Sequence, residues 1–172
     1  MDAYMVILRL IHIFAGIFWV GTTIFFVGYL APNVRALGPD GGKFMQGLLL
    51  NTRFDRAMPA ASILTTIAGI LLYARVTNNF SDTDYMSSAG GIVLSIGSLA
   101  GLLAFGHGGA VIGRIVGQQK TLAQQLASQD GPPSPEQGAE LATLNAKMGQ
   151  HTLITLVLMI IAVVGMSAAR YF

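Results

Sequence analysis

The stretch HTLITLVLMIIAVVGM, residues 151–166, has no charged side chain and opens on a histidine. Two other apolar stretches also contain one histidine each: LRLIHIFAGIFWVG, residues 8–21, and LLAFGHGGAVIGR, residues 102–114. A helix that crosses a bilayer needs about 20 mainly apolar residues. The three stretches therefore predict membrane helices, each of which carries an imidazole inside or beside its apolar part.

The composition favours lipid rather than water as the main solvent of this chain. Of its 172 residues, 53% are hydrophobic and 10% are charged, and the mean hydropathy is +0.61. Soluble domains carry about 25% charged residues. The net charge of +2 is small, which gives nucleic-acid binding no support. The chain has no cysteine, which excludes disulfides, iron–sulfur clusters, thiolate metal sites and covalently attached haem.

Four segments qualify, or nearly qualify, as membrane crossings. We expect an all-α, antiparallel four-helix bundle that forms one membrane domain over residues 1–172. A short helix is expected at Phe44–Leu50, and the breaker at Gly131–Pro135 should precede the fourth helix. The first apolar run follows no basic region, so we interpret it as a permanent helix. The expected crossings are residues 10–31, 57–74, 89–116 and 152–169.

The basic residues near the segment ends predict an orientation, because Lys and Arg concentrate on the cytoplasmic side. Both termini should lie outside, with the first and third connections in the cytoplasm of a bacterium whose inner membrane holds the protein. The cytoplasmic set is Arg35, Lys43, Arg53, Arg56, Arg114, Lys120 and Lys147, and the opposite set is Arg9, Arg75 and Arg170.

The three histidines are the candidate metal ligands. An imidazole in hydrocarbon faces the bundle interior and needs a partner, and imidazole is also a common axial ligand of haem iron. His107 lies about 10 Å from the cytoplasmic end of its helix, at a rise of 1.5 Å per residue, and His151 lies at the same boundary. His12 lies near the opposite face. Depth therefore favours His107 and His151 as the axial pair, with interhelical hydrogen bonding as the alternative role.

Two cations stand where haem propionates would emerge. Arg114 follows His107 by seven residues, and Lys147 precedes His151 by one helical turn on the same face. A guanidinium binds carboxylates through charge-assisted hydrogen bonds. The alternative is that both cations only mark the membrane interface.

The first helix carries a stripe of its own. His12, Gly16 and Trp19 recur at three- and four-residue spacing, together with Arg9 and Thr23. Gly16 leaves room for a flat ring or a close helix. His12 would bind a second cofactor, assist a proton path or contact a quinone near the outer face; otherwise it hydrogen-bonds a neighbouring helix and Trp19 is ordinary packing.

Several short motifs resemble a known group of small membrane proteins. Leu10-Ile11-His12, followed by Gly16, Trp19 and Gly21, resembles the first helix of the copper-resistance D-type superfamily and of the haem-b membrane protoporphyrinogen oxidases. The stretch RFDRAMPA, residues 53–60, and Phe105–Gly109 with Arg114 resemble later parts of the same proteins, and Leu144-Asn145 precedes the last crossing. The resemblance implies haem b at a third-helix histidine, which supports His107.

The sequence departs from that family at two places. The oxidases usually have a lysine that opens the third helix, whereas this chain has Ala89-Gly90-Gly91. His151 stands where the family would have no histidine. A relative of the same fold with another activity is therefore the interpretation.

Together these observations predict a membrane-embedded haem b protein that transfers electrons, as a subunit of a respiratory or quinone-linked redox complex. Ligation by two histidines would leave no open iron site, which favours electron transfer over oxygen chemistry. The alternatives are a protoporphyrinogen-oxidase-like enzyme and a cofactor-free structural or assembly subunit. Expected partners are the lipid bilayer, other membrane redox subunits or a second copy of the chain, and a quinone. The expected cofactor-binding residues are His107, His151, His12, Arg114, Lys147, Gly16 and Trp19.

Overall fold

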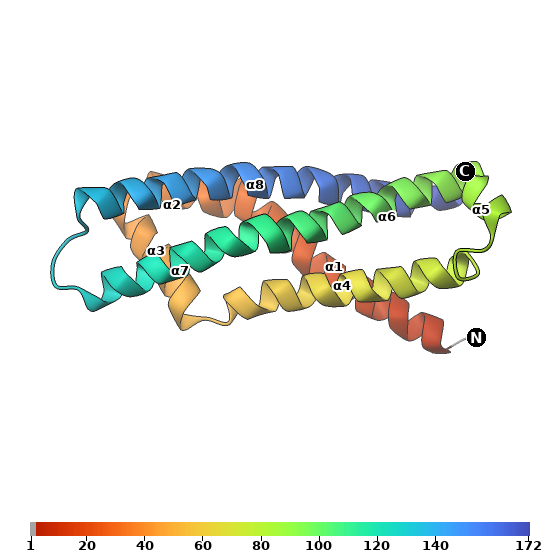
Figure 1. Cartoon of the computed structure of the whole chain (residues 1–172), viewed down its shortest axis with the longest axis horizontal. Helices are drawn as coiled ribbons and strands as arrows, with labels where there is room; N and C mark the ends of the chain where they lie inside the picture. Colours follow the sequence, from red (N-terminus) through yellow and green to blue (C-terminus); the bar gives the residue numbers. More distant parts are fainter. Residues whose placement is uncertain (1–2) are drawn as a thin grey trace.

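The computed structural model describes residues 3–172, and Figure 1 shows that most of the chain is helical. No strand occurs in this range, so the predicted all-α class is confirmed. The first two residues of the predicted domain lie outside the described residues. The elements are α1 (Ala3–Phe25), η1 (Phe26–Leu30), α2 (Ala31–Ala36), α3 (Pro39–Asn51), α4 (Phe54–Val76), α5 (Thr83–Ser87), α6 (Ala89–His107), η2 (Gly108–Ile112), α7 (Gly113–Ser128), α8 (Pro135–Ala168) and η3 (Ala169–Tyr171).

Four continuous helical units are long and apolar enough to cross a membrane, as expected of an integral membrane protein. Each of them contains one of the predicted crossings and extends beyond it at one or both ends. Large apolar side chains point outward along these units, among them Phe14 and Ile17. The units are Ala3–Ala36, Phe54–Val76, Ala89–Ser128 and Pro135–Tyr171.

The helices pack as two closely fitted pairs, α1 with α4 and α6 with α8. In Figure 1, α6 and α7 (green) run alongside α8 (blue). Glycine allows the α6–α8 approach, because a Cβ on Gly165 would lie 2.8 Å from the Cα of Gly97. The two pairs meet in a small buried cluster to which each helix gives one residue: Trp19, Ala61, Ala104 and Met159.

Two π-helical turns interrupt the long helices, and both contact α8. The turn η1 follows α1, and η2 begins directly after His107. Phe26 of η1 and Ile112 of η2 pack into one apolar cluster with Met148 of α8. Such turns are frequent at functional sites, and here they lie near His151 in the fold.

Polar contacts hold the helical extensions beyond the apolar core. Lys120 of α7 forms an ion pair of 2.5 Å with Asp55 of α4. The Gln46 side chain on α3 donates to the carbonyl of Ala123 over 2.8 Å. The helix α3 covers the expected Phe44–Leu50 and is longer at its start, and α8 begins at Pro135 behind a Ser134 capping box.

Candidate functional site

The first candidate centre is the histidine pair, His107 and His151. His107 is the last residue of α6, and His151 lies midway along α8. His107 Nε2 lies 3.2 Å from His151 Nδ1, and the ring centroids are 5.2 Å apart. The structure thus brings together the two imidazoles that the depth argument places at one level.

Thr155, one turn beyond His151 on α8, completes the pair as a hydrogen-bonded ring. The Thr155 hydroxyl donates to the carbonyl of His151 over 3.0 Å. His107 Nδ1 lies 2.8 Å from the same hydroxyl oxygen. A hydroxyl has one proton to donate, so His107 Nδ1–H is the donor of this second bond. When His107 is neutral, its Nε2 is then the acceptor for His151 Nδ1–H.

The histidine pair, as folded, does not fit a haem held by two imidazoles. The iron and the porphyrin plane would have to lie between the two coordinating nitrogens, yet His107 Nε2 and His151 Nδ1 are hydrogen-bonded to each other. Both nitrogens of His107 are engaged. The glycine contact of Gly97 with Gly165 also holds α6 close to α8 farther along the pair. Of the four ring nitrogens of the pair, only His151 Nε2 has no hydrogen bond to another of the described residues.

The two cations predicted for the propionates lie beyond the histidine pair on α7 and α8. Arg114 and Lys147 are both exposed. Among residues 3–172, neither has a carboxylate partner. Because the histidine pair does not fit a haem held by two imidazoles, the binding of haem propionates by these two cations stays a prediction.

The second candidate centre is His12, which lies on α1, away from the histidine pair of α6 and α8. His12 Nδ1 lies 2.8 Å from the backbone carbonyl of Thr65 on α4. The ring rests against Gly69, where a Cβ would lie 2.8 Å from His12 Cε1 and 3.0 Å from Nδ1. Gly69 therefore provides the room that the imidazole occupies.

The bond to Thr65 fixes the tautomer of His12. A carbonyl oxygen only accepts, so Nδ1 carries the proton and Nε2 keeps its lone pair when the ring is neutral. Histidines that bind metals usually donate their other ring N–H to a carbonyl or carboxylate in this way. His12 is therefore held in the form that coordinates a metal.

His12 lines a cavity of about 260 Å³ between the two helix pairs. All four long helical units contribute to its wall. Arg9 brings a charge and Ser98 a hydroxyl, while Met5 and Met166 bring thioethers. The remaining lining residues are Gly69, Leu72, Tyr73, Val76 and Leu94.

Gly16 and Trp19 have packing roles next to His12. A Cβ on Gly16 would lie 3.6 Å from Thr65 Cγ2, an ordinary van der Waals distance, so Gly16 faces α4. Trp19 is 9% exposed and belongs to the small cluster between the pairs. Beside Gly16, the buried Thr65 Oγ1 has no hydrogen-bond partner within the described residues.

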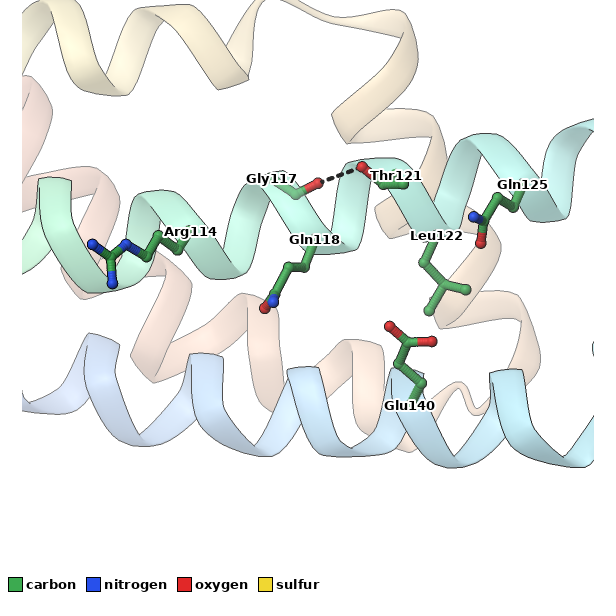
Figure 2. Close-up of a pocket in the computed structure, with 7 residues that line it drawn as sticks. All are labelled: Arg114, Gly117, Gln118, Thr121, Leu122, Gln125 and Glu140. Carbon is green, nitrogen blue, oxygen red and sulfur yellow. Dashed lines mark hydrogen bonds between the residues drawn. The ribbon is translucent and has the colours of Figure 1, made fainter.

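A polar pocket of about 510 Å³ lies at the far end of the molecule, between α7 and α8. Figure 2 shows Arg114, Gln118, Leu122 and Gln125 on one face of α7, with Glu140 of α8 opposite Leu122. The sequence signal for this pocket is a polar stripe at three- and four-residue spacing along α7.

Sequence reasoning missed the partners that define both histidine centres. Thr65, Gly69 and Thr155 are ordinary residues of apolar helices, and only tertiary packing shows that they contact imidazoles. Within the part of the chain that the structure describes, no three His, Cys, Asp or Glu residues are grouped as a metal site.

Comparison with known proteins adds no relative, because the chain matches no protein-family model, no curated protein and no solved structure.

Proposed function

We propose that the protein is a membrane-embedded haem b protein that transfers electrons, with His12 as the imidazole that binds the iron. The observation that supports this most is the hydrogen bond from His12 Nδ1–H to the Thr65 carbonyl. In the neutral ring this bond leaves the lone pair of Nε2 available to coordinate iron. His12 also lines the cavity between the helix pairs. Neither condition holds for His107, whose two nitrogens are both engaged.

Other residues of the cavity suit the remaining parts of a haem. Arg9 stands one turn before His12 and would bind a propionate through charge-assisted hydrogen bonds. The thioether of Met5 or Met166 would supply a second, soft ligand, and ligation by Met and His would raise the haem potential. The haem would supply one-electron oxidation and reduction; the chain would hold it without a covalent bond, because it has no cysteine.

The cavity volume requires the helix pairs to separate when a whole porphyrin binds. About 260 Å³ is below the ≈300–1,000 Å³ of typical ligand pockets. The α1–α4 and α6–α8 pairs contact each other less than the helices within each pair do, which supports such a separation, although the hydrogen bond of Tyr73 to Ser95 would have to break.

The same volume favours a second candidate, a quinone headgroup bound in the His12 cavity. A single substituted ring is much smaller than a porphyrin. Arg9 and Ser98 offer hydrogen-bond donors for quinone oxygens, and His12 Nε2 offers an acceptor for a quinol hydroxyl. In this case the protein would exchange electrons with the quinone pool through a partner subunit.

The setting of both candidates is the membrane. We propose that the four helical units cross a bacterial inner membrane as an antiparallel bundle, with both termini outside and the α2–α3 and α7–α8 connections in the cytoplasm. The distribution of Lys and Arg supports this orientation. The partners would be other membrane redox subunits or a second copy of the chain.

The identity of the bound group is tested on protein purified in detergent from cells with ample haem. A reduced-minus-oxidised visible spectrum and a pyridine haemochrome of the acid-acetone extract should report b-type haem. Organic extraction of the same sample detects a bound quinone. A colourless sample that contains quinone would support the second candidate, and one without either group would favour a cofactor-free structural subunit.

A further inference from the structure

When both rings are neutral, the hydrogen bonds around His107 and His151 allow one arrangement of protons in which all three bonds exist. Thr155 donates to the His151 carbonyl, His107 Nδ1–H donates to Thr155, and His151 Nδ1–H donates to His107 Nε2. Reversing the bond between the rings would make His107 Nδ1 an acceptor. Thr155 would then have to donate to that ring and give up its bond to the carbonyl.

Iron bound by His107 would remove the hydrogen bonds that hold the two rings together. Coordination through His107 Nε2 would break the bond between the imidazoles, and coordination through His107 Nδ1 would break the bond to Thr155. Thr155 is 2% exposed, so its hydroxyl has no water to replace His107. Buried polar groups that lose their partners cost about 1–3 kcal/mol each.

We infer that His107 and His151 do not ligate one iron between them and instead form a hydrogen-bonded clasp between α6 and α8. In this clasp both imidazoles carry their proton on Nδ1. Inside a membrane, polar side chains hydrogen-bond across helices and so fix how those helices pack. The helical unit Ala3–Ala36 contacts α8 and has no acidic residue from Arg9 to Arg35. This part of the unit therefore brings no carboxylate that could accept the Nδ1 protons of the two histidines. The nearest cations along the chain are Lys147 and Arg114.

His107 and His151 do not line the His12 cavity, but they help to position two helices that do. The cavity wall includes Ser98 of α6 and Met166 of α8, and these side chains keep their places only if α6 and α8 keep their register. The clasp sets that register at one level, and the contact of Gly97 with Gly165 sets it at another.

Amide substitutions separate a clasp from an iron ligand. The Asn side-chain nitrogen has the same place relative to Cβ as histidine Nδ1, so His151→Asn keeps the donor toward His107 and removes the imidazole. His151→Ala removes both. If the pair is a clasp, His151→Ala should lower the melting temperature by about 2–4 °C, for roughly 1 kcal/mol in a chain of this size, and His151→Asn should restore most of it. Both variants should keep the wild-type haem content, because the contact of Gly97 with Gly165 still holds α6 against α8 beside the cavity.

Nitrogen NMR of ¹⁵N-histidine protein measures the tautomers directly, with or without bound haem. We expect protonated Nδ1 and unprotonated Nε2 for His107 and His151 at neutral pH, with the assignments made from single-histidine variants. Protonated Nε2 on either ring would overturn the clasp. So would a low-spin haem signal that disappears in both His151→Ala and His151→Asn. A colourless protein with the expected tautomers would keep the clasp and reject only the proposed haem function.

Discussion

Replacement of Gly69 by alanine tests the His12 centre through a residue that carries no chemistry of its own. The new Cβ would lie 2.8 Å from His12 Cε1, whereas carbon atoms in contact are about 3.5 Å apart or more. The ring would therefore have to retreat by about 0.7 Å. A movement of that size directly away from α4 stretches the bond from Nδ1 to the Thr65 carbonyl from 2.8 Å to about 3.5 Å, outside the usual 2.7–3.2 Å range.

The expected consequence is weaker haem binding rather than loss of the fold. Loss of a partner that orients a metal-binding histidine typically costs 10–100-fold in affinity, and we expect the haem dissociation constant of Gly69→Ala to rise by about that factor. The assay is titration of haem into the haem-free protein in detergent, followed at the Soret band. Gly21→Ala is the matched control on α1, because its Cβ would meet nothing within 4 Å. Equal affinity for Gly69→Ala and wild type would refute the reasoning.

Three further predictions address the rest of the fold. Gly165→Ala should destabilise the α6–α8 pair by about 1–3 kcal/mol, because its Cβ would lie 2.8 Å from the Cα of Gly97. Gly149→Ala on the same helix should be tolerated, because its Cβ would meet nothing within 4 Å, and thermal unfolding in detergent measures both variants. Thr65→Val should leave haem affinity unchanged and the melting temperature unchanged or higher, because Oγ1 is buried without a partner among the described residues; a clear fall in either would contradict this. Reporter fusions after Gly42 and at the C-terminus should give signals from opposite compartments, and equal signals would reject the proposed topology.

The helical units could be predicted from the sequence, because a long apolar run without charged residues is typical of a membrane helix. The expected crossing at residues 57–74 lies within α4, and the one at residues 152–169 lies within α8 except for its last residue, which begins η3. The helix ends were less predictable. The first unit continues through a π-helical turn to Ala36, well past the expected end at residue 31, and hydropathy gives no signal for such a turn.

The candidate site could be predicted only in part. Depth along the helices brought His107 and His151 to one level, and they do meet. Depth does not say whether two imidazoles leave space for a porphyrin, because that depends on how closely α6 and α8 approach. The glycines of α6, η2 and α7 show the same dependence on packing: a Cβ on Gly97 or Gly101 would contact α8, whereas one on Gly109 or Gly117 would meet nothing within 4 Å.

The most direct test of the central claim is the low-spin haem spectrum of His12→Ala compared with that of His107→Ala, both purified as monodisperse protein from haem-supplied cells. His12 carries the free Nε2 beside the cavity, whereas His107 spends both nitrogens in the clasp. We therefore predict that His12→Ala loses the spectrum and that His107→Ala keeps it. Loss in His107→Ala with retention in His12→Ala would contradict the account and return the iron to the histidine pair.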